Sequence, residues 1–411
     1  MSVRIPRLRW QVTFSALKYP NYRLWFAGQI VSLFGTWMQN TAQGFLIYEI
    51  TKSPAYLGYV GFASGLPSWL FMMYGGVVAD RISRRTLMII TQTAMMLLAF
   101  ILAALTFLEM VQPWHIILLS FLLGVTNAFD TPARLVLVNE LVDREDLTNA
   151  IALNSVMFNT ATILGPAFAG IFYALFGPTW CFIMNGVSFI AVIIALALMK
   201  LRPSAKPVSR ASAPSELREG LAYVFAHKTI LTIIILIGVV GFFGLSFSTL
   251  YPAWAVDILG GDARINGLLR SAQGAGALLG AFTIASLGRF KYRGRLLTIG
   301  TFAFPISLLI FSAIRWIPLS LVILLGVGTA SILIMNLANS LVQTNVLDSL
   351  RGRVMSIYSM VFFGFMPLGM LVMGLIAEKY SEPIAVIFGS CGLLLSSIII
   401  WVFVPKLRSL E

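Results

Sequence analysis

Long apolar runs dominate the sequence, and short polar or basic clusters interrupt them. A helix that crosses the roughly 30 Å hydrocarbon core of a membrane needs about 20 predominantly apolar residues. The sequence therefore predicts an all-α membrane protein with twelve transmembrane helices. The predicted spans lie near 22–48, 54–79, 86–108, 114–138, 147–175, 178–199, 229–256, 265–288, 296–314, 317–342, 353–377 and 384–404.

Composition excludes several other classes of protein. Apolar residues make up 58% of the chain and charged residues 11%, whereas soluble domains carry about 25% charged residues. A disordered chain, a disulfide scaffold and an ordinary soluble enzyme are therefore excluded. Cys181 and Cys391 lie in different apolar runs, so we expect no disulfide. No metal-ligand, nucleotide or nucleophile motif is present in the sequence, so we expect no enzyme activity and no cofactor.

The positions of the basic residues predict the orientation in the membrane. With both termini in the cytoplasm, the inner segments hold 24 of the 29 Lys and Arg residues. This bias follows the positive-inside rule and predicts a multi-pass protein of the cytoplasmic (inner) membrane. The net charge of +13 then reflects topology and contact with the lipid bilayer, and we expect no nucleic-acid partner. The outer side holds Lys52, Arg264, Arg270, Arg315 and Lys379.

A polar linker and an internal repeat divide the chain into two halves. The stretch 200–220 is rich in Pro, Ser and Arg, which is typical of a linker. We expect six-helix bundles over 1–199 and 229–411, with a cytoplasmic linker over 200–228. Parallel repeats about an axis along the membrane normal are typical of transporters. A shift of 204 residues sets 150–155 on 354–359, Gly165 on Gly369 and Gly170 on Gly374, and a gapped shift sets Glu49, Gly58 and Gly65 on Asp257, Gly267 and Gly274.

The most specific motif is the stretch 75–85 between spans two and three, GGVVADRISRR. Its glycines allow close helix packing. Asp80 ends span two beside three arginines, and its carboxylate can bind an arginine or the amides at another helix N-terminus. Such a bond would hold one face shut in one state. The alternative is a plain positive-inside loop. On the inner rim we expect Glu140 and Arg144 to contribute to gating electrostatics.

A second motif lies in span five, where Gly165 and Pro166 precede Gly170. Proline removes a backbone donor and bends a helix, and the small residues allow close packing. We place Gly165, Pro166 and Gly170 among the gating residues. The alternative is a kink and a packing face without a role in transport direction.

These stretches resemble motifs of the major facilitator superfamily. Residues 75–85 resemble motif A, although Ser83 replaces the usual loop glycine. Residues 165–170 resemble the end of motif C, which is associated with exporters, with Ala169 in place of a glycine. The motif B arginine is absent around 117–124. The stretches 22–29, 37–39, 132–134 and 147–155 look like those of the enterobactin-exporter and drug-exporter group.

The resemblance implies the major facilitator fold and efflux of small molecules. It also implies that Asp80, Arg84 and the start of span eleven form an inner gate latch, which Arg81 and Arg85 accompany.

Ionisable residues within the spans are candidates for proton coupling. Asp130 lies in span four, where its carboxyl can accept a proton or pair permanently with Arg134 at i+4. Glu49 ends span one as an outer proton site or as a solvated helix end. Asp257 ends span seven in the same way, where we favour the solvated end. Arg270 in span eight either attracts an anionic substrate or extends to the outer surface.

Polar side chains within the spans predict a substrate cavity. A polar stripe on a membrane helix must face protein or a water-filled space. With aromatic neighbours, these residues suit bulky and partly apolar ligands. The alternative is hydrogen bonding between helices. The candidate substrate-binding residues are Gln39, Asn40, Gln43, Asn127, Asn154, Gln273, Asn336, Asn339 and Tyr358.

Together these observations predict a proton-coupled exporter that works by alternating access. Its expected partners are an amphipathic small-molecule substrate, such as a drug or siderophore, and protons, and we expect a monomer. Two alternatives remain open: an importer or lysophospholipid flippase on the same fold, and a non-transporting membrane receptor or assembly factor.

If Asp80 holds one face shut, Asp80→Asn is expected to reduce transport by roughly tenfold, because the amide loses the charge-assisted bonds but keeps the side-chain shape. Transport and membrane insertion of the tagged protein are measured side by side. Undiminished transport would refute the latch.

Overall fold

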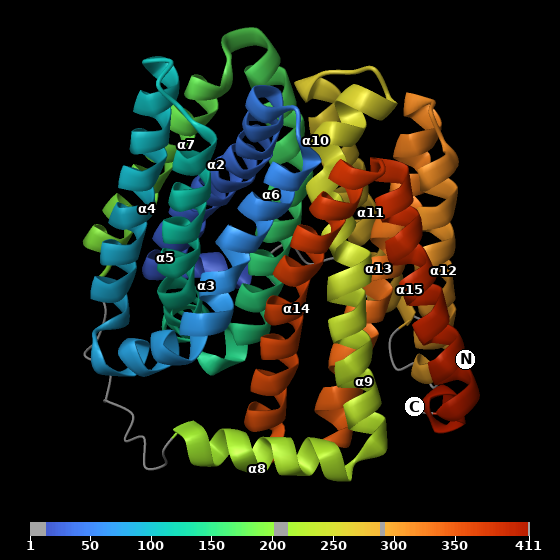
Figure 1. Cartoon of the computed structure of the whole chain (residues 1–411). Helices are drawn as coiled ribbons and strands as arrows, with labels where there is room; N and C mark the ends of the chain where they lie inside the picture. The colour runs from blue at the N-terminus through green and yellow to red at the C-terminus, as the bar shows by residue number, and fades with distance from the viewer. Residues whose placement is uncertain (1–13, 201–212, 288–291, 410–411) are drawn as a thin grey trace, which may run out of the picture.

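The computed structural model describes residues 14–200, 213–287 and 292–409, and these residues are helical almost throughout (Figure 1). The side chain of Asp80 lies outside the described part. The elements are η1 (Ser15–Lys18), α2 (Pro20–Thr51), α3 (Pro54–Arg81), α4 (Arg84–Phe107), α5 (Pro113–Glu140), η2 (Arg144–Asp146), α6 (Leu147–Phe176), α7 (Pro178–Leu198), α8 (Ala213–Ala226), α9 (Lys228–Val239), η3 (Val240–Gly244), η4 (Leu245–Leu250), α10 (Tyr251–Ala253), η5 (Trp254–Ile258), α11 (Ala263–Leu287), α12 (Arg293–Ala313), α13 (Ile317–Asn345), α14 (Arg351–Lys379), α15 (Glu382–Phe403) and η6 (Pro405–Ser409).

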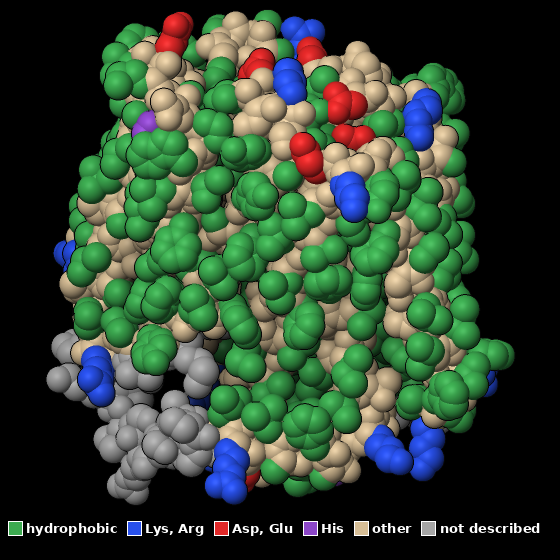
Figure 2. All heavy atoms as spheres, in the orientation of Figure 1, with side chains coloured by type: hydrophobic (Ala, Val, Ile, Leu, Met, Phe, Trp, Pro, Cys, Tyr) green, Lys and Arg blue, Asp and Glu red, His purple; other side chains and the backbone are tan. Residues whose placement is uncertain are grey.

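The helices confirm the predicted all-α membrane fold. Within the described ranges, nine segments are long and apolar enough to cross a membrane. The helices α2, α3 and α11 match them in length and complete the twelve predicted spans. Figure 2 shows a belt of hydrophobic side chains around the middle of the molecule, with charged side chains at its two ends. Such a surface suits a bilayer, where only apolar groups are stable against the lipid tails.

Proline and glycine mark the short connections between helices. Pro20, Pro54, Pro113 and Pro178 each occupy the first turn of a helix, where the missing N–H has no partner to lose. Gly177 joins α6 to α7 with a φ of 84°, a conformation that glycine adopts without strain. These tight connections make α6 and α7 antiparallel neighbours.

The seventh span differs from the regular helix predicted over 229–256. It runs from Lys228 to Ile258 and changes from α-helix to π and 3₁₀ turns at Val240, with a second π turn at Trp254. Pro252 lies in the first turn of α10, where it cannot donate a helical hydrogen bond. Such irregular turns within a helix often mark functional positions.

Two bundles pack side by side, α2–α7 and α9–α15, and each has its own buried core. Large side chains such as Trp25 and Phe182 fill the first core, and Trp254, Phe304 and Phe311 fill the second. The bundles contact each other mainly through two helix pairs, α3 with α14 and α6 with α11.

The internal repeat places the same small residues at both contacts between bundles. At one, a Cβ on Gly374 would lie 2.8 Å from the Cα of Gly58. At the other, a Cβ on Gly267 would lie 3.2 Å from the Cα of Gly170. The repeat that pairs Gly170 with Gly374 and Gly58 with Gly267 therefore forms two equivalent glycine seams. Close backbone approach of this kind drives helix association in lipid.

The hydrogen bonds between the two bundles lie toward the end of the molecule opposite α8. The end of the molecule that carries α8 is called the α8 end, and the opposite end is called the far end (Figure 1). Hydrogen bonds that join the bundles lie in the half toward the far end. They link Tyr48 to Asp257, Ser53 to Glu378, Thr249 to the Leu57 carbonyl, Asn266 to the Thr41 carbonyl and Ser271 to the Ile163 carbonyl.

Gly374→Val is expected to open the far end, because the added side chain would overlap the backbone of Gly58 and Pro54. Overpacking of this kind costs about 1–3 kcal/mol, which shifts a two-state equilibrium roughly 5- to 150-fold. The measurement is labelling of Leu57→Cys by a membrane-impermeant maleimide, with both native cysteines replaced by serine.

The matched control is Gly352→Val on the same helix, where an added Cβ meets no atom within 4 Å. Equal labelling in the two variants would contradict a closing role for the glycine seam.

Candidate functional site

Two amides within the predicted spans are exposed. Asn40 on α2 and Asn336 on α13 lie well inside their helices, yet both side chains are exposed. An exposed amide at membrane depth is costly against lipid and stable against water. Asn339 lies one turn after Asn336 and accepts a hydrogen bond from Gln343. These amides favour a wet space bounded by α2 and α13.

Other predicted substrate residues lie inside a bundle. Asn185 donates a hydrogen bond to Gln39 (2.7 Å), and Gln43 donates one to Ser120 (2.6 Å). Both glutamines are buried. These bonds join α2 to α7 and to α5, as the alternative of interhelical hydrogen bonding expects. Substrate contact by Gln39 and Gln43 stays a prediction.

The other predicted substrate-binding residues differ in their hydrogen-bond partners. Asn127 donates to the Leu123 carbonyl of its own helix, and the Tyr358 hydroxyl donates to the Met335 carbonyl. Gln273 accepts a hydrogen bond from the Tyr251 hydroxyl (2.9 Å). The Oδ1 atom of Asn154 is buried without a hydrogen-bond partner among the described residues, so this atom is available to another donor.

Asp130 faces α4 and is 1% exposed. Its Oδ1 atom accepts hydrogen bonds from Thr91 (2.7 Å) and Gln92 (3.0 Å), and its Oδ2 atom lies 3.7 Å from Arg134 Nε. This arrangement is the structural ion pair that the sequence left open beside proton coupling. A coupling role for Asp130 stays a prediction.

The acidic side chains at the far end connect the helices there. Glu49 is exposed and accepts a hydrogen bond from Tyr173 of the same bundle. Asp257 accepts one from Tyr48 of the other bundle. Glu378 accepts hydrogen bonds from Ser53 (2.6 Å) and from the Ala55 amide (3.3 Å), also across the bundles. Asp257 is exposed at its helix end, as expected, and it also takes part in the contact between the bundles at the far end.

Sequence reasoning missed Tyr48, Ser53 and Glu378. The repeat that sets Glu49 on Asp257 was the available signal, because it places an acidic group at the far end of both bundles. It contains no information on the hydroxyl groups that these acids meet.

At the α8 end, Arg84 and Arg85 of the predicted gate contact residues of their own bundle. Arg84 pairs with Glu140, and Arg85 donates to the Ala197 carbonyl (2.6 Å). Arg81 and Arg144 are exposed. At the start of α14, Arg351 pairs with Asp348 and Arg353 with Glu219 of α8. The predicted latch between the motif and α14 stays a prediction, because the Asp80 side chain lies outside the described part.

The Gly165–Gly170 stretch positions α6 between the bundles. A Cβ on Gly165 would lie 2.6 Å from the Cβ of Trp37 on α2, and a Cβ on Gly170 would lie 2.6 Å from the Ala263 carbonyl of α11. Pro166 lies inside α6, and its carbonyl faces Gly267. The stretch therefore packs against both bundles at once.

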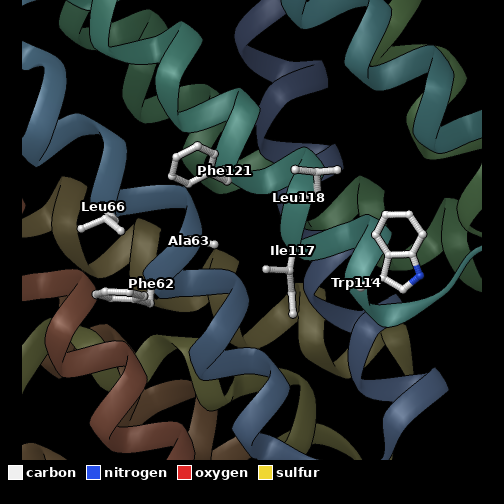
Figure 3. A pocket seen from close by; sticks show the side chains of 7 residues that line it. All are labelled: Phe62, Ala63, Leu66, Trp114, Ile117, Leu118 and Phe121. Carbon is white, nitrogen blue, oxygen red and sulfur yellow. The ribbon is translucent and has the colours of Figure 1, made fainter.

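The first bundle also has an apolar pocket of about 340 Å³ between α3 and α5 (Figure 3). Its lining offers almost no polar groups, and the indole of Trp114 already donates to Gln112. The pocket suits an apolar chain and not a polar substrate group. It is lined by Phe62, Ala63, Leu66, Trp114, Ile117, Leu118 and Phe121.

Comparison with known proteins decides the family. A major facilitator family model described as "Transmembrane secretion effector" matches residues 11–411. The chain belongs to this family. It is a multi-pass membrane transporter of the major facilitator superfamily, as the sequence motifs predicted, and not an enzyme.

Its relatives are exporters and transporters of siderophores and drugs. The staphyloferrin A transporter of Staphylococcus aureus is 25% identical over 87% of this chain and 90% of its own. The enterobactin exporter EntS of Citrobacter koseri is 24% identical over 98% and 96%. Macrolide efflux protein A of Streptococcus pyogenes is 23% identical over 88% and 91%.

Solved structures confirm the fold of this transporter. The nucleoside transporter NupG superposes with a TM-score of 0.71 at 16% identity and covers 94% of this chain and 98% of its own. A D-xylose-proton symporter superposes with a TM-score of 0.72 at 12% identity over 93% and 98%. These low identities support the architecture alone.

Tyr48→Phe is expected to loosen the far end, because it removes a hydrogen bond to Asp257 across the bundles. A hydrogen bond to a charged group contributes about 1.5–3 kcal/mol. Spin labels at Ile50→Cys and Arg264→Cys, both exposed at the far end, report the distance between the bundles.

Tyr173→Phe is the matched control, since it removes the same kind of bond within the first bundle. The prediction is wrong if both variants give the same distance distribution.

Proposed function

We propose that this transporter is a proton-coupled exporter of amphipathic small molecules, such as a drug or siderophore, that works by alternating access. The observations that support it most are the exposed amides of Asn40 and Asn336 within the spans and the hydrogen bonds between the bundles, which lie toward one end. Efflux and exporter relatives that cover 88% and 98% of the chain add to this support.

Alternating access requires that each end can close in turn. The glycine seams and the bonds of Tyr48 and Ser53 hold the far end closed. In the opposite state the α8 end closes, and the motif at 75–85 supplies the latch. Arg84 would then leave Glu140 and bind the residues that close the α8 end. One guanidinium cannot bind Glu140 and those residues together with good geometry.

The membrane orientation follows from charge. Figure 2 shows Lys and Arg side chains at both ends and acidic side chains gathered at the far end. The helix ends near α8 hold Arg81, Arg84, Arg85, Arg351 and Arg353, so we expect this end to face the cytoplasm under the positive-inside rule. Both termini are then cytoplasmic, and the protein lies in the cytoplasmic (inner) membrane as a monomer. The segment 200–228 serves as the cytoplasmic linker between the bundles 1–199 and 229–411. Substrate enters from the α8 end, which gives the direction of export.

Proton coupling is assigned to Glu49 rather than Asp130. Glu49 is exposed at the far end and can exchange protons with the outside. Asp130 is enclosed by Thr91, Gln92 and Arg134. Protonation of Glu49 removes the charge beside Tyr173 and alters the end of α2, where the bundles meet.

The expected substrate is bulky and partly apolar. Asn40 and Asn336 supply amides to the space, and Trp69 packs against Gly364 of α14 where the bundles meet. Aromatic walls with few polar groups bind amphipathic molecules by area rather than by many hydrogen bonds.

A pH gradient that is acidic inside everted vesicles is expected to drive uptake of a fluorescent amphipathic dye, because protons that leave the vesicle exchange for substrate. The difference from vesicles without a gradient should be at least about tenfold, since one pH unit corresponds to about 1.36 kcal/mol. An ionophore that dissipates the gradient should abolish uptake.

Glu49→Gln should remove most of this gradient-driven uptake, and Glu109→Gln, an exposed acid just after α4, is the control. Uptake by whole cells instead of everted vesicles would identify an importer. Uptake that ignores the gradient would exclude proton coupling.

A further inference from the structure

Arg270 extends from α11 toward α2 of the other bundle. It lies two turns into α11 from the far end, and its guanidinium lies over the ring of Tyr251, 5.5 Å from the centroid. A Cβ on Gly44 of α2 would lie 3.7 Å from Arg270 Nη2. The side chain therefore extends toward the other bundle, and the alternative of extension to the outer surface does not hold. Arg264, nearer the start of the same helix, is the exposed arginine.

No described residue neutralises the charge of Arg270. Its Nε atom is buried without a hydrogen-bond partner, and no ion pair to Arg270 occurs in the described ranges. The acids at this end have other partners, since Asp257 binds Tyr48 and Asp262 pairs with Arg264. An unpaired cation at membrane depth is costly, and such residues mark substrate or ion pathways.

Polar groups surround this cation on one helix face. Asn266, Arg270 and Gln273 are spaced four and three residues apart, so they share a face of α11. Asn266 is 1% exposed, and its Oδ1 atom has no partner among the described residues. Asn40 and Gly44 share the facing side of α2 by the same spacing. A half-buried guanidinium at such a place is open to a ligand but shielded from bulk solvent.

We propose that Arg270 binds an anionic group, a carboxylate or a similar planar oxyanion, on the transported molecule. The guanidinium offers parallel N–H donors that match two oxygens of such a group, and partial burial strengthens the attraction. This inference rests on the proposed function and narrows it, because it makes the substrate an amphipathic anion. The anion would lie where α2 and α11 meet.

The test compares a charged probe with its neutral counterpart. Pyrenebutyrate and its methyl ester share the same apolar body, and pyrene fluorescence reports their binding to the full-length protein in lipid nanodiscs after subtraction of empty nanodiscs. Arg270→Gln is expected to weaken binding of pyrenebutyrate by at least about tenfold, as removal of a buried charge partner does. Binding of the ester should change by less than about twofold, because it lacks the charge.

Two further variants distinguish a loss of binding caused by the missing charge from a loss caused by misfolding. Arg264→Gln removes an exposed arginine from the same helix and should leave both probes unaffected. Gln273→Glu keeps an acceptor for the Tyr251 hydroxyl and places a carboxylate one turn from Arg270. That carboxylate should occupy the guanidinium and weaken pyrenebutyrate binding without any loss of the arginine.

Probe binding tests the anion site, and probe transport tests the proposed export, so the two can fail separately. Loss of pyrenebutyrate binding in both Arg270→Gln and Gln273→Glu, with the ester retained, supports the anion site even if no probe is transported. In that case the exporter proposal fails alone. The anion site is wrong if the wild-type protein does not bind pyrenebutyrate, or if the variants lose binding of both probes equally. In that case, transport of the ester in everted vesicles would still support the exporter proposal.

Discussion

Close backbone contact between small residues is the constraint on which the arrangement of the two bundles depends. Lipid tails are as apolar as leucine side chains, so helices in a membrane gain little from hydrophobic burial against each other. They associate where backbones approach closely and where polar groups find partners. Gly58 with Gly374 and Gly170 with Gly267 provide such approaches at the two contacts between bundles. The repeat makes these two contacts equivalent.

The far end combines these seams with hydrogen bonds that cross between the bundles. Tyr48 and Ser53 donate to Asp257 and Glu378, and each bond joins a hydroxyl of one bundle to a carboxylate of the other. At the α8 end the charged groups bind within their own half, as Arg84 does with Glu140. This difference between the ends is one of the observations on which the proposal of alternating access rests.

The polar residues of the spans divide into two groups by their partners. Gln39, Gln43 and the Oδ1 atom of Asp130 form hydrogen bonds with neighbouring helices of the first bundle, and these bonds stabilise that bundle. Asn40 and Asn336 are exposed, and the Nε atom of Arg270 has no hydrogen-bond partner among the described residues. Groups of the second kind are the better candidates for contact with a transported molecule, since an unsatisfied polar group in a membrane protein is retained against a cost in stability.

The amino-acid sequence by itself determined the all-α membrane fold, the repeat and the family, because hydropathy, basic clusters and motif A are local patterns that need no tertiary contact. The motif spacing also identified Gly170 as a packing position. Tertiary structure decided which polar side chains have partners. Gln39 and Asn40 are adjacent in the chain, yet one binds Asn185 and the other is exposed, since a step of about 100° around a helix separates a bundle interior from a cavity wall. Tertiary structure also decided the direction of the Arg270 side chain. It extends toward α2 because two bundles from distant parts of the chain pack against each other.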